Sequence, residues 1–475
     1  MRTVLQTIAV CIALSLGLGG QPALAGQSSW PQTWGGPRQD VGVSVALDAQ
    51  GNVYVAGNTT SFGAGGVDVL ILKYSASGTL QWAKTWGGPD YDTAFRIAVG
   101  PDGYIYVTGN TLSYGFGWSA VFLLKLDTNG DLQWGQAWGQ GADNVGYDLG
   151  FDQAGNIYVV GAINNGSAGV TNPAVILKFS STDGALLWST LWQGEATSDS
   201  GYAGGYSLTV DANFNVIIAG SAGDFSTDVS HNVIFLLKYD SSGNYLWNEI
   251  WYTPWSGSAM PQDGATPAHS LATDGNGNIY IGGQHSNNCP SSNFSECEFS
   301  ALVLKVDTNG NFQWARTWGN PGYDWAGGLG IDSAGHLLVA GDENAPRRKL
   351  FVLSYSADDG TLLSSVAGNG ASTFTGDLPG LAINSAGNAW IAASAKDNSG
   401  AWVAASAPAG SLPNSFIFGL ASSVTTPPGQ TMALTTPTQS QTGVINTGGG
   451  KADMLVVVYP HSLSAGPFQN FPPLN

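Results

Sequence analysis

A tryptophan-bearing run recurs along this chain, and that recurrence limits the possible fold more than any other feature. The run Gln-Trp-Ala-Lys-Thr-Trp-Gly-Gly at 81–88 returns, with small changes, at 133–139 and at 313–319. Successive copies lie 50 to 67 residues apart, a period typical of stacked or circular repeat architectures. The first Trp of the run falls at Trp30, Trp82, Trp134, Trp188, Trp247 and Trp314, and Ser364 replaces it in a weaker copy.

Each repeat contains four short apolar runs. In the first repeat, one run ends at the turn Asp48–Asn52, Val53–Gly57 is the second and Val69–Tyr74 is the third. The tryptophan run is the fourth, and it follows the turn Ser75–Gly78. Short β-branched and aromatic runs between Gly and Asn turns predict strands, and no helical period is visible after the first 25 residues. We therefore expect an all-β chain with four antiparallel strands per repeat.

Four-stranded repeats of this length predict the blades of a single β-propeller. A linear solenoid would need polar caps at both ends, and none is visible. The Asp-x-x-Gly turn occurs seven times, counting one copy in which Phe214 replaces Gly. A degenerate eighth copy follows, because Ala452–Tyr459 aligns with Val67–Tyr74 without a gap. We therefore expect eight blades, with seven blades plus an extra C-terminal hairpin as the alternative.

The strand around Trp30 and Trp34 precedes the first repeat and has no repeat of its own. We expect this N-terminal strand to close the last blade by pairing near Met454–Tyr459, because closure would cover an open sheet edge. The expected organisation is a signal peptide at 1–25, a propeller at 26–460 and a C-terminal tail at 461–475.

The residues from Lys73 to Phe95 and from Asp152 to Gly161 resemble the bacterial β-propeller repeat family called SBBP. The resemblance covers about residues 30–395. It implies a propeller fold and an exported bacterial protein, and it implies no particular activity.

Charge and the N-terminus restrict the possible partners. The formal net charge is −18, so nucleic acid and anionic lipid surfaces are not expected partners. The first residues combine Arg2, an apolar run from Ile8 to Leu18 and the sequence Ala-Leu-Ala ending at Ala25. This pattern predicts a cleaved signal peptide, and the run is too short for a membrane span. We expect a secreted protein, extracellular or periplasmic, without membrane insertion.

Two cysteines remain after the expected cleavage, Cys289 and Cys297. In an oxidising compartment, a pair this close is expected to close its own loop by a disulfide. Two free thiols or half of a metal site are the other readings of the same spacing.

No pattern of catalytic residues is recognisable. The five His residues are scattered over different repeats, and no metal-ligand spacing or nucleophile elbow occurs. We therefore expect no catalytic residues and no cofactor, although a catalytic pair assembled across blades would leave no trace in one sequence.

One hairpin turn has the oxygen spacing of a calcium loop, with Asp127, Asn129 and Asp131 at alternate positions. Tight turns favour the same residue types, and no bidentate Glu follows. We expect these residues to stabilise the hairpin turn, and Ca²⁺ binding is the alternative.

A recurrent polar residue precedes the first strand of several repeats, and the loop that carries it is expected at the mouth of the central channel. Such a ring could hold a cation or set a negative potential. The simpler reading is that each residue caps its own loop. The candidates are Asp40, Asp92, Asn144 and Asp324.

The first Trp of each run is expected to dock neighbouring blades, with stacking of glycans on exposed Trp as the alternative. These docking residues are Trp82, Trp134, Trp188, Trp247 and Trp314.

We expect a secreted, non-enzymatic binding or scaffold module that recognises an extracellular protein or polysaccharide through the loops of one face of the ring. One alternative is a polysaccharide lyase or hydrolase with its site at the channel mouth. The other is a structural component of the cell surface or extracellular matrix.

Overall fold

The computed structural model describes residues 32–36, 38–115, 118–140, 143–164, 172–193, 202–224, 231–251, 268–288, 298–319, 324–343, 349–367, 379–384, 387, 389–394 and 401–405, and four residue pairs between 435 and 456. All regular structure in these residues is strand. Within them, the chain forms no apolar helix long enough to span a lipid bilayer. The expected signal peptide, the C-terminal tail at 461–475 and both late cysteines lie outside these residues.

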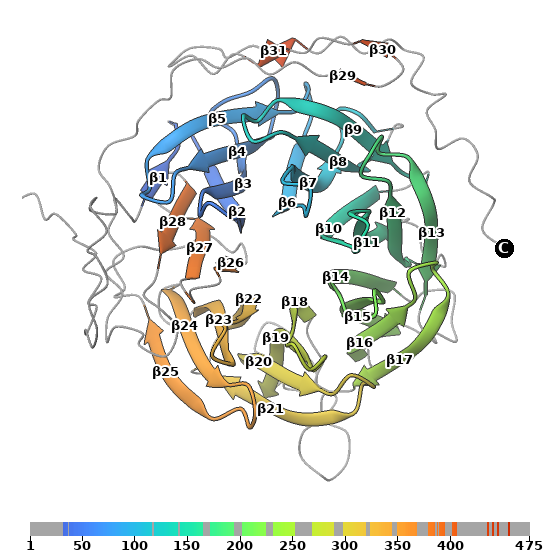
Figure 1. Ribbon diagram of the computed structural model, residues 1–475, viewed down its shortest axis with the longest axis vertical. Coiled ribbons are helices and arrows are strands. Elements are labelled where there is room, and N and C mark those ends of the chain that lie inside the picture. Colours follow the sequence, from blue (N-terminus) through green and yellow to red (C-terminus); the bar gives the residue numbers. More distant parts are fainter. Residues whose placement is uncertain are drawn as a thin grey trace, which may run out of the picture.

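The strands form four-stranded antiparallel sheets that radiate from a common axis as the blades of a propeller (Figure 1). Blade 1 contains β2 (Asp40–Leu47), β3 (Val53–Thr59), β4 (Asp68–Tyr74) and β5 (Leu80–Trp86). Blade 2 contains β6 (Asp92–Val99), β7 (Ile105–Thr111), β8 (Ala120–Leu126) and β9 (Leu132–Trp138). Blade 3 contains β10 (Asp143–Phe151), β11 (Ile157–Asn164), β12 (Ala174–Phe179) and β13 (Leu186–Trp192).

The next three blades repeat this order, with the first strand of each at the axis and the fourth at the outer edge. Blade 4 contains β14 (Tyr202–Val210), β15 (Val216–Asp224), β16 (His231–Tyr239) and β17 (Tyr245–Trp251). Blade 5 contains β18 (Ala268–Thr273), β19 (Ile279–Asn288), β20 (Glu298–Val306) and β21 (Phe312–Trp318). Blade 6 contains β22 (Trp325–Ile331), β23 (His336–Glu343), β24 (Lys349–Ser356) and β25 (Leu362–Ala367).

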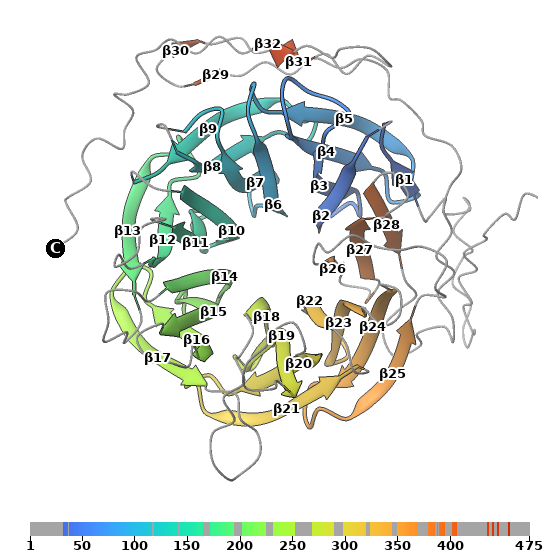
Figure 2. The ribbon, with the colours of Figure 1, turned by 180° about the vertical axis from the view of Figure 1, so that it is seen from behind.

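A seventh sheet joins the two ends of the ring. It contains β26 (Gly380–Ile383), β27 (Ala389–Ser394), β28 (Ala401–Ala405) and the N-terminal strand β1 (Gln32–Trp34) at its outer edge. Strand β1 pairs antiparallel with β28, so that Trp34 lies opposite Ala401. Figure 2 shows this blade from behind, between β2 of blade 1 and the strands of blade 6.

The expected count of eight blades is wrong. Six blades consist of four consecutive strands and one combines β26–β28 with β1, so the ring closes before the residues assigned to an eighth copy. In that region the described residues form only two-stranded pairings, outside the ring of blades (Figure 1). These are β29 (Thr435–Thr436) with β30 (Gln439–Ser440), and β31 (Val444–Ile445) with β32 (Leu455–Val456).

Closure by the N-terminal strand is found, but its expected partner was wrong. Strand β1 pairs with β28 rather than with Met454–Tyr459. The physical reason is that β28 offers a complete edge beside blade 1, and β1 removes that edge by pairing with it. Blade 7 then has four strands, like the other blades, without any of the residues assigned to an eighth copy.

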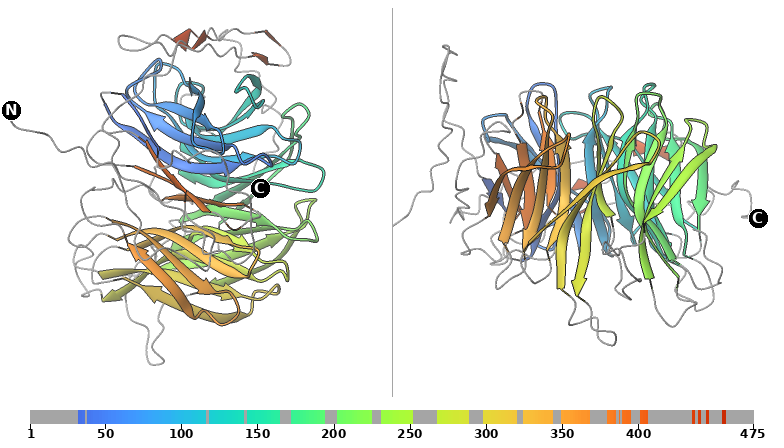
Figure 3. Two further views of the ribbon diagram at one scale, coloured as in Figure 1. Left: turned by 60° about the vertical axis from the view of Figure 1, so that its left-hand side comes forward. Right: turned by 90° about the horizontal axis from the view of Figure 1, so that it is seen from below.

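The core lies between the faces of neighbouring blades. Val69 and Ile71 of blade 1 pack in one cluster with Ile97 and Val107 of blade 2. Because the third strand of a blade is covered on both faces, its sequence is a continuous apolar run rather than an alternating one. Strand β8 is buried at every position. Seen from the side, the strands run between the two faces of the ring (Figure 3).

The outer edges of neighbouring blades are joined by a repeated contact. Trp82 Nε1 of blade 1 donates to the Thr128 carbonyl of blade 2 at 3.2 Å, and Lys73 Nζ donates to the same carbonyl at 2.8 Å. Gly130 in that turn has a φ of 77°, and a Cβ there would lie 3.0 Å from the Trp82 ring. The turn therefore needs glycine both for its conformation and for the approach of the ring.

Candidate functional site

A β-bulge interrupts the innermost strand of each of the first six blades. In β6, the register shifts between Ala94 and Arg96, which leaves Phe95 without a partner in β7. A bulge re-aims the side chain of the extra residue, and here all the extra residues are half-buried. They are Val43, Phe95, Tyr147, Tyr206, His269 and Gly327.

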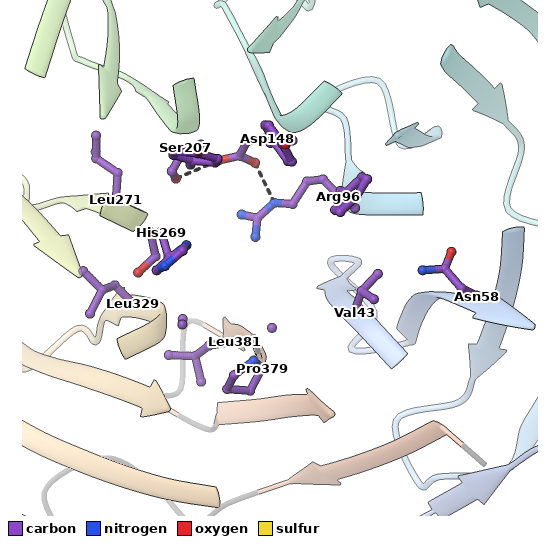
Figure 4. Close-up of a pocket in the computed structure, with 17 residues that line it drawn as sticks. Val43, Asn58, Arg96, Asp148, Ser207, His269, Leu271, Leu329, Pro379 and Leu381 are labelled. Carbon is purple, nitrogen blue, oxygen red and sulfur yellow. Dashed lines mark hydrogen bonds and ion pairs between the residues drawn. The ribbon is translucent and has the colours of Figure 1, made fainter. Parts of the chain in front are cut away.

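These bulge residues line one cavity of about 320 Å³ at the ring axis (Figure 4). Blade 7 completes the lining with Pro379, Gly380 and Leu381, so all seven sheets contribute to it. The volume lies within the range of about 300–1,000 Å³ typical of small-molecule sites. The lining is mostly apolar and aromatic with a few polar groups, which is also typical of such sites.

Aromatic rings follow one another around part of this cavity. The Phe95 and Tyr147 ring centroids lie 5.2 Å apart, and those of Tyr147 and Tyr206 lie 4.9 Å apart. The His269 ring lies 6.0 Å from Tyr206 and 5.0 Å from Trp325. These five residues, one from each of blades 2 to 6, are called the aromatic arc below.

The polar end of the cavity is an ion pair that joins blades 2 and 3. Arg96 Nε lies 2.9 Å from Asp148 Oδ1, and the Asp148 side chain is only 5% exposed. Ser207 Oγ donates to Asp148 Oδ2 at 2.8 Å, and the Leu208 amide donates to the same oxygen at 2.9 Å. Asp148 Oδ1 also accepts the Leu149 amide at 2.8 Å. Three hydrogen bonds therefore hold the carboxylate in place, and Arg96 Nε contacts it as an ion pair without the alignment of a hydrogen bond.

The titratable groups of the aromatic arc are shifted away from neutral pH. Burial lowers the pKa of His269 to about 3, and its Nε2 atom is buried without a hydrogen-bond partner among the described residues. Burial, with a smaller contribution from Tyr206, raises the pKa of Tyr147 to about 12. Burial also raises the pKa of Tyr206. At neutral pH the arc is uncharged, so it offers ring faces, hydroxyl groups and a neutral imidazole.

The recurrent residues expected at the channel mouth are buried at the start of the innermost strands. Asp92, which is not exposed, accepts the Gly88 amide at 2.7 Å, Ser113 Oγ at 2.6 Å and the Thr111 hydroxyl. Asp40 has the corresponding contacts with Gly36, Ser61 and Thr59 in blade 1. Each of these carboxylates caps its own loop, and neither lines the cavity.

Asn144 and Asp324 occupy the same position in other blades. Asn144 Nδ2 donates to the Ser119 carbonyl at 3.0 Å, and the Asp324 amide donates to the Phe299 carbonyl at 3.1 Å. Both side chains are buried and lie outside the cavity lining. The four candidates are therefore distributed around the ring, one per blade, rather than brought together at one point.

A second buried carboxylate faces Asp92 across a blade junction. Asp68 is 1% exposed, and burial raises its pKa to about 7. A Cβ on Gly87 would lie 2.2 Å from Asp68 Oδ1 and 2.8 Å from Asp92 Oδ2, so the two carboxylates meet at this glycine. At the next junction, Gly139 faces Ala120 and Asn144 instead. The carboxylate pair therefore occurs at the junction of blades 1 and 2 and is absent from the junction of blades 2 and 3.

The turn with calcium-like spacing is held by its own hydrogen bonds. Asp127 Oδ1 accepts the Asn129 amide at 2.8 Å and the Asp131 amide at 2.9 Å. Asp131 Oδ1 pairs with Lys84 Nζ at 2.9 Å. Among the described residues, no group of three or more His, Cys, Asp or Glu side chains is arranged to hold a metal ion. Calcium binding at this turn stays a prediction.

The expected docking tryptophans lie in the outer strands, away from the cavity. Trp188 Nε1 donates to the Ser241 carbonyl at 3.3 Å and Trp314 Nε1 to the Asp358 carbonyl at 3.2 Å. Trp134 lies against Gly184 of the next blade, and Trp247 against Gly310. Each of these Trp side chains, like Trp82, contacts a turn of the next blade. Cys289 and Cys297 lie outside the described residues, so the disulfide stays a prediction.

Sequence reasoning missed the residues of the cavity itself. A signal was available, because Val43, Phe95 and Tyr147 each stand three positions after the recurrent polar residue of their repeat. This position changes from blade to blade while its surroundings repeat. A position that varies between repeats and is often aromatic, inside an otherwise regular strand, therefore identifies the residues that line the cavity.

The comparisons with known proteins support the fold and the repeat. A family model described as a beta-propeller repeat, SBBP, matches residues 33–63. This match supports the expected repeat family in the first blade, and bacterial origin stays a prediction.

One curated relative is the uncharacterized WD repeat-containing protein L264 of Acanthamoeba polyphaga mimivirus, which is 23% identical over 418 residues. The alignment covers 64% of this chain but only 29% of the length of that relative.

Among solved structures, an ulvan lyase of the polysaccharide lyase family PL25 is similar with a TM-score of 0.50 and 12% identity, covering 81% of this chain and 96% of that one. The WD40 domain of Pan2 from Neurospora crassa is similar with a TM-score of 0.46 and 11% identity, covering 77% and 89%. At this level of identity, the likeness to the lyase shows the shared β-propeller fold and nothing further.

Proposed function

We propose that this chain is a non-enzymatic binding module that holds a sugar ring of a glycan in the cavity at the ring axis. The observation that carries the proposal is the aromatic arc, of which four half-buried rings, from blades 2 to 5, line a cavity that also contains the Arg96–Asp148 ion pair. Ring faces provide the broad apolar contact that a sugar ring can cover, and a few polar groups fix its orientation.

The cavity favours a glycan over a folded protein as the bound group. Specific protein interfaces bury roughly 800 Å² on each partner, which needs a broad surface rather than an enclosed space. A cavity of about 320 Å³ accommodates a small ring or a single side chain. Recognition of an extracellular protein through the loops of one face, as the sequence suggested, is the alternative form of the proposal.

The acid–base properties of the cavity favour binding over catalysis. A general base works best with a pKa near the operating pH. The pKa of His269 is about 3 and that of Tyr147 is about 12, so neither group exchanges a proton readily at neutral pH. Asp148 is occupied by its ion pair with Arg96 and by three hydrogen bonds. We therefore favour binding, and a polysaccharide lyase or hydrolase with its site at the channel is the alternative function.

The proposal places the module outside the cytoplasm, either extracellular or periplasmic. The pattern of a cleaved signal peptide in residues 1–25 supports this placement. No cofactor is assigned to the module.

A glycan array combined with a panel of polysaccharide substrates tests the proposal. We expect glycan binding without turnover, and we expect Tyr147→Leu to lose most of the binding, because it keeps an apolar side chain but removes the ring. Tyr245→Leu is the matched control, since Tyr245 begins an outer strand and is 51% exposed. Turnover of any substrate would favour the enzyme. A blank array together with self-association in light scattering would favour a structural component.

A further inference from the structure

We propose that the glycan carries an acidic group, a carboxylate or a sulfate ester, and that Arg96 binds this group through its two terminal nitrogens. The inference rests on the proposed glycan-binding function and names the chemical class of the ligand. It starts from a difference between Arg96 and the other cationic side chains of the ring.

The other described cations are used to hold the chain together. Eight Lys and Arg side chains donate to a backbone carbonyl or pair with a carboxylate, in most cases on the next blade. The contacts are Arg38 to the Thr60 carbonyl, Lys73 to Thr128, Lys84 to Asp131, Lys125 to Ser181, Lys178 to Ser241, Lys238 to Thr308, Lys305 to Ala357 and Arg316 to Gly360.

Arg96 uses only one of its nitrogens in this way. Its Nε atom pairs with Asp148 at 2.9 Å, whereas Nη1 and Nη2 have no partner in the part of the chain that the structure describes. Figure 4 shows the end of the guanidinium group directed into the opening between the blades. The Arg96 side chain is 39% exposed, in contrast to 5% for Asp148. Its two terminal nitrogens therefore face the cavity and its solvent.

The arrangement is suited to an oxyanion. The planar guanidinium group presents two parallel N–H donors that match the two oxygens of a carboxylate or sulfate. Because the ion pair with Asp148 already restricts the Arg96 side chain, less rotamer freedom is lost when a ligand binds than for an unpaired Arg. A neutral hydroxyl would accept from only one of the two donors and would leave the positive charge of the guanidinium group without a counter-charge.

The position of Arg96 relates the acidic group to the ring-binding surface. Arg96 directly follows the bulge residue Phe95, and Asp148 directly follows the bulge residue Tyr147. The two residues of the ion pair are therefore sequence neighbours of the two rings at one end of the aromatic arc, and they line the same cavity. A sugar that covers these rings has its substituents within the reach of the guanidinium group.

The charge of the whole chain limits how acidic the ligand is. The net charge of −18 opposes the approach of a polyanion, as it does for nucleic acid. At physiological salt, the Debye length of about 8 Å screens most of this field inside a local site. The proposed ligand is therefore a glycan with isolated acidic groups rather than one densely charged along its length.

Equilibrium binding of three small probes to the full chain tests the inference. The probes are D-glucuronate, D-glucose 6-sulfate and D-glucose, with the fluorescence of the protein as the signal. We expect one of the two acidic probes to bind about tenfold more tightly than glucose, which corresponds to one charge-assisted contact. The better acidic probe distinguishes a carboxylate from a sulfate ester.

The variants separate Arg96 from general charge effects. Arg96→Gln is expected to bind all three probes equally weakly, and Arg96→Lys is expected to recover only part of the preference because it lacks the paired donors. Arg38→Gln removes the same charge from an exposed loop and is expected to keep the preference. Thermal melting of each variant shows that it is folded.

Two results would overturn the acidic-ligand inference without affecting the proposed glycan binding. They are equal binding of glucose and both acidic probes by the unaltered chain, and an unchanged acidic preference in folded Arg96→Gln. In either case glycan binding itself still stands. If no probe binds and the glycan array is blank, the proposed function fails, and the acidic-ligand inference fails with it.

Discussion

The outer edge and the axis of this ring are built from the same repeat, yet they differ in how strictly the repeat is kept. At the outer edge, Trp82 and Trp314 each donate to a carbonyl of the next blade at 3.2 Å. At the axis, equivalent bulge positions hold Val43, Phe95 and Gly327. The contact of a Trp with a carbonyl of the next blade recurs at several junctions, whereas the residue at the bulge position changes from blade to blade. Uniformity therefore marks the scaffold, and variation marks the candidate site.

Removing the strand that closes the ring is expected to have the largest effect. Deletion of residues 26–36 removes β1 and with it Trp34, which is 2% exposed and packs 5.0 Å from the Phe62 ring. We expect unfolding to become easier by more than the about 3–5 kcal/mol typical of one buried Trp, because the pairing with β28 is lost too. Chemical denaturation followed by Trp fluorescence measures the change.

The deletion should also expose the edge of β28 and promote aggregation, which size-exclusion chromatography detects. Trp118→Ala is a suitable control, since Trp118 is 56% exposed and should change stability little. A truncated protein that stays monomeric and melts like the full chain would show that the outer edge of blade 7 does not need closure.

A single docking contact should have the next largest effect. Trp82→Ala removes a side chain that is 7% exposed and covers Gly130 of the next blade. We expect a loss of about 3 kcal/mol in the free energy of unfolding. Trp82→Phe keeps a ring and loses only the Nε1 donor, and the Thr128 carbonyl still accepts Lys73 Nζ. Its cost should be about 1 kcal/mol. Equal costs for both variants would contradict docking by ring burial.

The buried carboxylate of Asp68, at the junction of blades 1 and 2, provides a third test of the scaffold. The folded pKa of Asp68 is about 7, above the unfolded value of about 3.9, so the folded state binds the proton more tightly. Stability from this group is present below about pH 4 and is lost as the pH rises toward 7. Asp68→Asn removes this loss, and we expect it to stabilise the chain at pH 8 by on the order of 2 kcal/mol.

Denaturation of the two proteins at pH 4 and pH 8 measures this effect, and their stability difference should grow between these values. Asp152→Asn has the opposite sign and is the control. Burial raises the pKa of Asp152, but hydrogen bonds from Asn156 and Lys178 outweigh burial and lower it. Its contribution is therefore present above about pH 4 and lost below it. A pH-independent difference between the Asp68 variant and the unaltered chain would contradict the buried carboxylate pair.

The sequence predicted the scaffold because the scaffold repeats. The turn at Asp211–Asn215 shows how far this reasoning reaches. Phe214 stands where other repeats have Gly, and the residue adopts a φ of 63° like the glycines Gly155 and Gly277 at the same place. The register of the repeat therefore determined the backbone even where the residue type did not.

The blade count and the cavity could not be obtained in the same way. Residues Ala452–Tyr459 match a third strand in composition, but a strand forms a blade only with neighbours to pair with, and β28 is already paired with β1. The cavity depends on side chains that are distant in sequence, such as Arg96 and Asp148, and on bulges that turn them inward. The repeat marks the bulge position in each blade, but it does not show which of these side chains meet at the axis.

The smallest expected effect is at the axis, where His269→Phe should leave the scaffold intact. The imidazole ring contacts the Tyr206 and Trp325 rings, and a phenyl ring of similar shape can keep both contacts. The substitution also removes Nε2, which is buried without a partner in the described part of the chain. Since an unsatisfied buried polar atom is unfavourable, we expect the variant to be as stable as the unaltered chain, or more stable by about 1 kcal/mol, at pH 7.

The pH dependence distinguishes this explanation from simple tolerance of the substitution. The folded pKa of His269 is about 3, below the unfolded value of about 6.5, so only the unfolded state takes up the proton as the pH falls. The unaltered chain should therefore lose stability below about pH 6.5 through this residue, and His269→Phe should not. Melting temperatures measured between pH 7 and pH 5 should diverge in favour of the variant. A constant difference would mean that the imidazole is hydrated in the channel, and that the axis is more open to solvent than its buried nitrogen indicates.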